Sequence, residues 1–231
     1  MQIQHDNRAV ILRFGYPLRT LSSAPFNGGS RRARSIVNLK TDSRAVLENA
    51  PEDLISDFLN ARGLGADSVG LLTSAGMEYA QFIDRQERGI AILAVVTAGT
   101  SNALNIAERS DTEFTGKDRT GHGTINIVVV TNCFLLDETM VSSLITATEG
   151  KTAALLDLGV KSVATGAQAT GTGTDTVVVV SGNGPHIRYA GGHTLFGQLL
   201  GNAVYCGVKS SLLEQPTKRE GFGVLENLFQ F

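Results

Sequence analysis

The residues best suited to chemistry stand near the two ends of one segment, 171–194. Asp175 follows a Gly-Thr-Gly-Thr loop, and His193 follows two glycines just before a helix-like segment. A run of four valines between them, 177–180, predicts a buried strand. Glycine lets backbone N–H groups approach a polar ligand closely, although loops of this composition also occur as plain turns. The segment therefore predicts a small-molecule site with one carboxylate and one imidazole.

The position of His193 suits a general base. A helix is predicted over 195–213, with Thr194 as its N-cap. The N-terminus of a helix disfavours the imidazolium form and offers free N–H donors. A neutral imidazole beside such donors suits proton transfer next to an oxyanion site. The alternative is that His193 only caps the helix or packs at its start.

A second carboxylate, Glu149, lies in the clearest predicted helix, 137–158. Helical spacing places one buried stripe along this helix, made of Val141, Ile145, Thr148, Thr152, Leu155 and Gly159. Glu149 and Lys151 flank that stripe on opposite sides, and residues two apart do not face each other. Each is expected to meet another group at the helix–sheet boundary. For Glu149 the alternative is a half-buried carboxylate with a purely structural partner.

The remaining pattern predicts an α/β fold, a single-domain sandwich over 1–231 with a mixed β-sheet and helices packed on its faces. Pro17 is expected to end the first strand. Strands are expected at 8–16, 19–24, 35–39, 69–74, 79–85, 90–97, 123–131 and 176–180, and two further helices at 51–62 and 103–108.

Composition excludes several classes of protein. Charged residues make up 18% of the chain and the net charge is −2, so neither nucleic acid nor a membrane surface is an expected partner. The longest apolar runs are far shorter than the ~20 residues of a membrane span. Cys133 and Cys206 show no pairing pattern and are expected to be reduced thiols, which predicts a cytoplasmic protein. The histidines show no metal-ligand spacing, and GxxxxGK[ST], HExxH, CxxC and GxSxG motifs are absent, so no metal and no cofactor are expected.

Polar residues in loops and strands are candidates for ligand contacts. Asn27 and Gly28 form a turn signal, and Ser101 and Asn102 follow the buried strand 90–97, where capping of a short helix is the alternative. Asn126 lies inside an apolar strand and needs partners, so it either staples the sheet or contacts a ligand.

Two segments have special compositions. The polar, glycine-rich segment 110–122 is expected to be a mobile loop or a lid. The apolar tail 221–231 is expected to pack on the body or on a second subunit, which would make the chain a homodimer.

Six segments in fixed order carry a family resemblance. They are LSSAPFNGG (21–29), TAGTSNA (97–103), GTINIVVVT (123–131), ITATEGKTAALLDLGV (145–160), TGTGTDTVVV (170–179) and YAGGHTLFGQLLG (189–201). Together they resemble the adenosylcobinamide amidohydrolase family over roughly 21–212. Gly150 and Gly192 depart from the alanine and threonine expected of that pattern.

The resemblance implies a corrinoid-salvage hydrolase of cobalamin biosynthesis. Such enzymes cleave the amide that joins a propionyl side chain of the corrin ring to aminopropanol in adenosylcobinamide, giving adenosylcobyric acid. The cobalt corrinoid is the substrate and not a cofactor. The alternatives are a non-catalytic module that binds a corrinoid or another small ligand, and an enzyme that transfers an acyl or phosphoryl group.

For the hydrolase, we predict His193, Asp175 and Glu149 as the acid–base set, with Asp175 orienting His193. Thr174 or Thr124 is a further candidate for the nucleophile. Contacts to the amide-rimmed corrinoid are predicted for Asn27, Gly28, Ser101, Asn102, Asn126, Gly171, Gly173 and Thr174.

Overall fold

Two long strands shape the molecule. The computed structural model describes residues 1–108 and 123–213. In it, β2 (Ala9–Ser22) and β3 (Gly29–Lys40) run through the middle of an eight-stranded sheet in the order β4-β3-β2-β11-β8-β6-β5, with β1 paired to β2. The other strands are β1 (Gln2–His5), β4 (Ser68–Thr73), β5 (Gln81–Glu87), β6 (Ile90–Ala98), β8 (Ile125–Thr131) and β11 (Thr176–Ser181). The pairs β3–β4 and β8–β11 are parallel and the others antiparallel, so the sheet is mixed.

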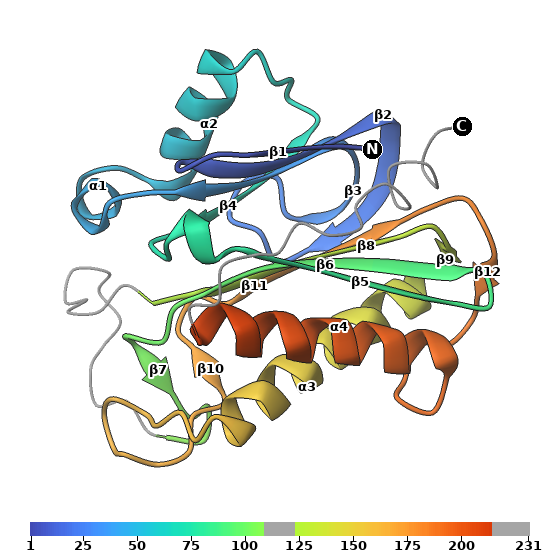
Figure 1. The fold of residues 1–231 in the computed structure, drawn as a ribbon. Helices are drawn as coiled ribbons and strands as arrows, with labels where there is room; N and C mark the ends of the chain where they lie inside the picture. The colour runs from blue at the N-terminus through green and yellow to red at the C-terminus, as the bar shows by residue number, and fades with distance from the viewer. Residues whose placement is uncertain (109–122, 214–231) are drawn as a thin grey trace.

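The sheet folds over because β2 is irregular at its centre. The register between β2 and β3 shifts between Arg13 and Leu18, and Pro17 lies within this irregularity. A proline at a bulge withdraws no ladder hydrogen bond, so the expected strand end at Pro17 is wrong. The first half of β2 pairs with β1, and the second half pairs with β11. The two halves of the sheet thus form the two layers of a sandwich (Figure 1).

The core between the two layers is drawn from both halves of the sheet. Fully buried residues of this core include Leu12 of β2, Ile36 of β3 and Leu71 of β4 on one side. Leu93 of β6 and Val128 of β8 belong to the other side of the same cluster. One apolar cluster thus joins strands that are far apart along the sheet, so the two halves of the sheet pack on each other, which the predicted sandwich of one mixed sheet and its helices did not include.

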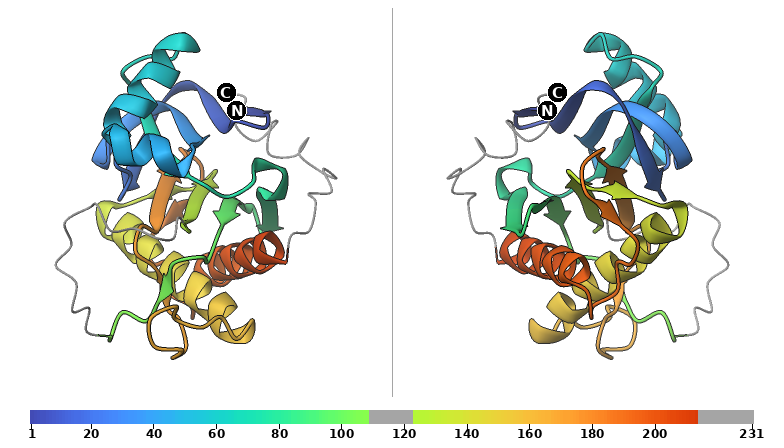
Figure 2. Two further views of the ribbon diagram at one scale, coloured as in Figure 1. Left: turned by 90° about the vertical axis from the view of Figure 1, so that its left-hand side faces the viewer. Right: turned by 90° about the vertical axis from the view of Figure 1, so that its right-hand side faces the viewer.

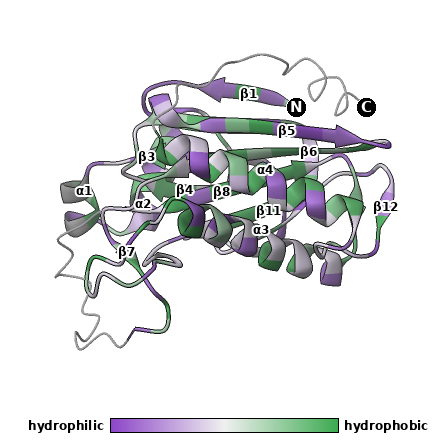
Figure 3. Ribbon diagram, turned by 60° about the horizontal axis from the view of Figure 1, so that its bottom comes forward, coloured by the Kyte–Doolittle hydropathy of each residue, from purple (hydrophilic) through white to green (hydrophobic). Residues whose placement is uncertain are grey.

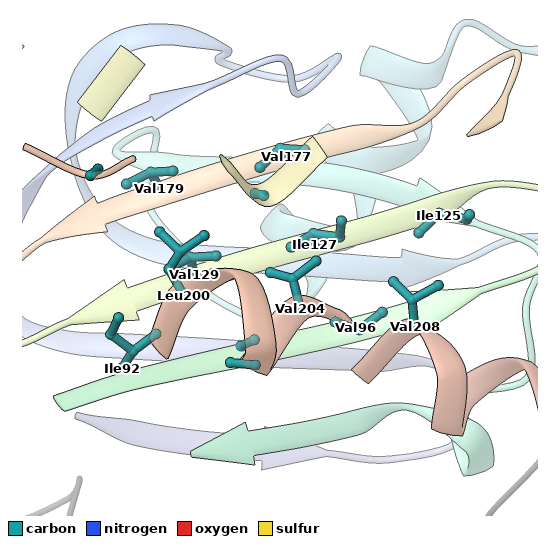
Figure 4. Close-up of a cluster of buried hydrophobic side chains, with 14 of the residues drawn as sticks. Ile92, Val96, Ile125, Ile127, Val129, Val177, Val179, Leu200, Val204 and Val208 are labelled. Atoms are coloured by element: carbon teal, nitrogen blue, oxygen red, sulfur yellow. The ribbon is translucent and has the colours of Figure 1, made fainter. Parts of the chain in front are cut away.

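Helices cover both outer faces (Figure 1). On one side α2 (Pro51–Ala61), which follows the short α1 (Ser43–Glu48), packs Ile55, Phe58 and Leu59 against β2, β3 and β4. On the other side α3 (Asp137–Asp157) and α4 (Leu195–Leu212) cover β6, β8 and β11. Figure 4 shows Leu200, Val204 and Val208 of α4 lying over the valines and isoleucines of these strands. The long helices and buried strands are therefore where the sequence pattern predicts them.

Two short ribbons and one turn complete the described part of the chain. β7 (Ala103–Leu104) pairs with β10 (Gly171–Thr172), and β9 (Phe134–Leu135) pairs with β12 (His186–Ile187). A 3-10 turn, η1, spans Met77–Tyr79. The predicted helix at 103–108 is wrong, because Ala103 and Leu104 take a strand partner from the Gly-Thr loop instead of capping a helix.

The buried face of α3 also differs from the prediction. Val141 and Ile145, which the prediction placed on the buried face, are 51% and 57% exposed. Of the residues of the predicted stripe that lie within the helix, Leu155 is the one that is buried. The buried positions are Thr139, Met140, Ser143, Thr146, Ala147, Gly150, Lys151, Ala154 and Leu155. A Cβ on Gly150 would lie 2.7 Å from the carbonyl oxygen of Gly201 in α4, so small residues set this helix contact. Figure 3 shows hydrophobic and hydrophilic residues mixed along α3, which is why apolar periodicity alone selects the wrong face.

Four further sequence-based expectations concern the lid, the C-terminal tail, the two cysteines and membrane-spanning helices. The expected lid at 110–122 and the apolar tail at 221–231 lie outside the described residues. Cys133 and Cys206 are free thiols. Among the helices in the described part of the chain, none is both long enough and apolar enough to cross a membrane.

Candidate active site

A cavity of about 300 Å³ lies at one end of the sandwich. This end, where β3 and β4 finish and where β8 and β11 begin, faces the viewer in the left view of Figure 2. Its lining residues come from the ends of strands, from the loops beside them and from the start of the α1–α2 region. They are Ser23, Pro25, Thr41, Val46, Pro51, Leu72, Thr73, Ser74, Asn102, Gly123, Thr124, Thr174, Asp175 and Thr176.

The lining combines an apolar side with a hydroxyl-rich side. Pro25, Val46, Pro51 and Leu72 supply the apolar surface, while serines, threonines and Asn102 supply most of the polar surface. Among the described residues that line the cavity, Asp175 is the one with an ionisable side chain. Such a surface suits a small, neutral or cationic group that has both apolar and hydrogen-bonding parts.

The carboxylate of Asp175 is held by four hydrogen bonds. Its Oδ1 accepts from the Thr172 hydroxyl at 2.5 Å and from the Ile125 backbone N–H at 3.0 Å. Its Oδ2 accepts from the Thr172 N–H at 3.0 Å and from the Lys151 ammonium at 2.5 Å. Asp175 therefore joins the start of β8 to β10 and to the C-terminal third of α3, and these bonds fix its place in the cavity wall.

Lys151 is a buried cation that the sequence analysis did not place in the site. Its side chain is 9% exposed, and that of Asp175 is 12% exposed. A Cβ on Gly171 would lie 2.6 Å from Asp175 Oδ2 and 2.7 Å from Lys151 Nζ, so glycine makes room for this ion pair. The signal was present in the sequence, since Lys151 lies at the helix–sheet boundary and needs a partner there.

The two threonines proposed as nucleophiles join the loops that enter β8 and β11. The Thr124 hydroxyl donates to the Thr174 carbonyl at 2.8 Å, and the Thr174 hydroxyl donates to the Gly123 carbonyl at 3.4 Å. Both side chains line the cavity. Either hydroxyl would have to leave a backbone acceptor before it could donate to another group.

Asn126 takes part in a buried polar chain beneath the cavity. Its Nδ2 donates to Asn38 Oδ1 and to the Leu72 carbonyl, both at 2.8 Å. Asn38 in turn donates to the Thr97 hydroxyl at 2.9 Å. These bonds join the two layers of the sandwich, which gives Asn126 a structural role. The Oδ1 atom of Asn126 is buried without a partner among the described residues.

The other predicted ligand contacts fall into three groups. Asn102 and Thr174 line the cavity, whereas Gly171 of β10 and the loop residues Ser101 and Gly173 lie beside it without lining it. Asn27 and Gly28 shape the turn that follows the cavity-lining residues Ser23 and Pro25. Asn27 has a positive φ of 55° and donates to the carbonyls of Ala66 and Ser68 at 2.9 and 2.8 Å. At Gly28, a Cβ would lie 2.3 Å from the Ala24 carbonyl oxygen.

Glu149 and His193 do not line the cavity. Both are exposed, and no hydrogen bond or ion pair within the described residues joins either of them to Asp175. β11 carries the chain away from Asp175 by about 20 Å, at ~3.3 Å per residue. α4 begins at that far end and finishes near the cavity end, where Ser211 accepts from the Ala98 N–H (Figure 1). The structure therefore does not bring Asp175 to His193, and the catalytic roles assigned to the three residues stay predictions.

Helix capping and packing against α3 explain the conformation of the segment around His193. The predicted N-cap is confirmed, since the Thr194 hydroxyl accepts from the Gly197 N–H at 3.0 Å. The Thr146 hydroxyl of α3 donates to the carbonyl of buried Ala190 at 2.8 Å. A Cβ on Gly197 would lie 2.2 Å from the Gly191 carbonyl oxygen. These contacts fix the start of α4 against α3 without involving the imidazole of His193.

The described residues hold no group of three or more His, Cys, Asp and Glu side chains arranged to bind a metal ion. The polar groups of the cavity are instead hydroxyls, one amide and one carboxylate that is neutralised by lysine. This arrangement supports hydrogen bonding to a polar organic group.

Comparison with known proteins identifies a family. The family model for adenosylcobinamide amidohydrolase matches residues 1–220. A curated protein of Methanosarcina mazei with that name is 35% identical over 200 residues, which is 82% of this chain and 88% of the relative. An uncharacterized protein of Methanocaldococcus jannaschii, MJ1613, is 33% identical over 180 residues, covering 71% of this chain and 70% of that protein. Among solved structures, the PH0078 protein of Pyrococcus horikoshii OT3 matches 94% of this chain and 80% of its own, with 12% identity and a TM-score of 0.45.

Proposed function

Because the chain belongs to the adenosylcobinamide amidohydrolase family, we propose that it hydrolyses the aminopropanol amide of adenosylcobinamide at the cavity, giving adenosylcobyric acid and free aminopropanol. One observation carries the choice of site. Four of the six segments that resemble the family, 21–29, 97–103, 123–131 and 170–179, each supply residues to the cavity lining. A fifth segment supplies Lys151, which binds Asp175.

The size of the cavity decides which part of the substrate enters it. A volume of about 300 Å³ is at the lower end of the range of ligand pockets. A corrin macrocycle with its peripheral amides is too broad for such a space, whereas the side chain that ends in aminopropanol is narrow. We therefore expect the side chain to enter while the ring stays outside, against the rim that the strand ends and loops form.

The lining suits this side chain. Aminopropanol has a methyl group, a hydroxyl and an amide nitrogen, and the cavity offers apolar side chains, hydroxyls and Asp175. Hydrolysis needs an activated water or nucleophile, donors for the oxyanion, and a proton for the departing amine. We assign Asp175 to hold the attacking water or the departing nitrogen, since it is the ionisable group at the cavity. Glu149 and His193 remain candidates whose contribution substitution would decide.

The direct test is product analysis. Purified protein is incubated with adenosylcobinamide, and the masses of the corrinoid and of the released amine are followed over time. Adenosylcobyric acid and aminopropanol in equal amounts are expected, with Asp175→Asn protein prepared in parallel as a control for contaminating hydrolases. Unaltered corrinoid that stays bound to the protein would replace this function with that of a binding module. A modified corrinoid with an intact amide would point to group transfer.

A further inference from the structure

Lys151 is the most deeply buried charged residue on the described part of α3. The residue is 7% exposed, and its ammonium donates to one acceptor, Asp175 Oδ2. A buried lysine is unfavourable unless a carboxylate or other acceptors compensate for its lost hydration. Its neighbour Glu149 is exposed and does not serve as its partner. The position of Lys151 is therefore tied to Asp175.

Among the described residues that bind Asp175, Lys151 is the one with a charged side chain. From β10 the partners of Asp175 are the N–H and hydroxyl of Thr172, and from β8 the partner is the N–H of Ile125. All three donors are neutral, and Lys151 from α3 is the charged one. Gly171 supplies the space in which both charged groups fit. The chain has thus built a compact site for one carboxylate–ammonium pair.

We propose that Lys151 is a positioning residue for the hydrolysis proposed above, fixing the Asp175 carboxylate in the cavity wall. Lys151 does not line the cavity, so it acts through Asp175 and not on the substrate. Without the ammonium, Asp175 Oδ2 would keep only the bond from the Thr172 N–H, and the carboxylate would lose one of the four bonds that orient it.

The test compares the steady-state kinetics of Lys151→Met with those of wild type. We expect kcat for adenosylcobinamide to fall by about a hundredfold, with KM changed by less than about threefold. Lys209→Met is the matched control, because Lys209 of α4 also pairs with an aspartate, Asp157, but this pair is more exposed and neither residue lines the cavity. It is expected to leave kcat and KM unchanged.

Two further variants guard against a purely structural effect. Lys151→Ala removes the side chain beyond Cβ, and added propylammonium replaces the missing atoms. Partial recovery of kcat that saturates with propylammonium is expected. Lys151→Arg keeps a charged donor for Asp175, so its kcat should lie between that of Lys151→Met and that of wild type.

The outcomes separate this proposal from the function on which it rests. A folded Lys151→Met protein with unchanged kcat would overturn the role of Lys151, while hydrolysis by wild type would leave the function standing. If Lys151→Met does not fold, absence of propylammonium rescue in folded Lys151→Ala would overturn it. Failure of wild type to release aminopropanol would instead count against the function itself.

Discussion

The candidate ionisable groups occur in two opposite environments. At the cavity end, Asp175 and Lys151 are buried, paired and surrounded by neutral donors. Glu149 on the outer face of α3 and His193 at the far end of the sandwich are exposed and have no hydrogen-bond or ion-pair partner among the described residues. Because burial strengthens electrostatic interactions, a buried carboxylate at the cavity end interacts more strongly with a polar group than an exposed carboxylate does. The difference points to the cavity as the place of reaction.

Segments that resemble the family nevertheless occur at both ends, and they serve different purposes. At the cavity end they supply Asp175 and the hydroxyls that line a space. At the far end the segment 189–201 supplies the cap of α4 and the close contacts of Gly197 and Gly201 with their neighbours. Resemblance to a family therefore marks the packing of α3 against α4 as well as the candidate site.

The largest effect is expected when the cavity is filled. Val46→Trp places a large side chain in the cavity lining, whereas Val141→Trp adds the same group to the exposed face of α3. We expect Val46→Trp to lower kcat/KM for adenosylcobinamide by about a hundredfold or more, because the side chain of the substrate loses its space. Val141→Trp should change kcat/KM by less than about twofold. Steady-state kinetics on both proteins would measure the contrast, and equal effects would remove the cavity from the account.

Glycines at the two ends should differ in the stability that they provide. A Cβ on Gly171 would meet both members of the Asp175–Lys151 pair, whereas Gly192 has no atom within 4 Å of the same position. We expect Gly171→Ala to lower the free energy of unfolding by about 1–3 kcal/mol, as overpacking of a tight site does. Gly192→Ala should stay within about 0.5 kcal/mol of wild type.

Urea unfolding of the two alanine variants measures this difference directly. Both proteins must retain cooperative unfolding for the comparison to hold. A Gly171→Ala protein as stable as Gly192→Ala would mean that the ion pair relocates easily, which would weaken the case for a rigid Asp175.

The smallest effect is expected at an exposed ion pair. Asp157 of α3 accepts from Lys209 and, at 2.7 Å, from the Tyr205 hydroxyl of α4. Hydrogen bonds from Lys209 and then from Tyr205 lower the pKa of Asp157, and the bond to Asp157 raises the pKa of Lys209. Because all three groups face solvent, the pair contributes little to stability.

The direction of each shift gives the pH window of that small contribution. The lowered pKa of Asp157 stabilises the fold above the usual range of aspartate, and this is lost as pH falls through the lower folded value. The raised pKa of Lys209 stabilises the fold below the usual range of lysine, and this is lost as pH rises through the higher folded value. We therefore expect Lys209→Met to lower Tm slightly at neutral pH, with the difference vanishing once the pH falls below the lowered pKa of Asp157. A difference that persists in acid would assign the effect to lost packing of the lysine stem.

Continuous apolar runs made the buried strands and the helix-covered mixed sheet predictable from sequence. β6, β8 and β11 are buried on both faces because helices cover one face and the other layer covers the second. The Gly-Thr loop also indicated Asp175, since glycine lets backbone N–H groups approach a polar group closely. These features depend on local composition, which a single sequence contains.

The remaining features depend on long-range pairing, which a single sequence does not contain. Asp175 and His193 are near in sequence, but β11 separates them in space by running the length of the sheet. Lys151 belongs to the cavity end only because α3 crosses behind β10. The buried face of α3 is set by small residues such as Gly150, and apolar periodicity gives no signal for that choice.

The central claim is that the cavity end and not the far end carries the reaction. The most direct test is kcat/KM with adenosylcobinamide for Asp175→Asn and His193→Ala, each checked for a native melting transition. We expect Asp175→Asn to lose about a hundredfold to ten-thousandfold, the range of acid–base groups, and His193→Ala to lose less than about threefold. The assignment of His193 to the acid–base set predicts the opposite for that variant. A His193→Ala protein without activity beside an active Asp175→Asn protein would contradict the account and move the site to the start of α4.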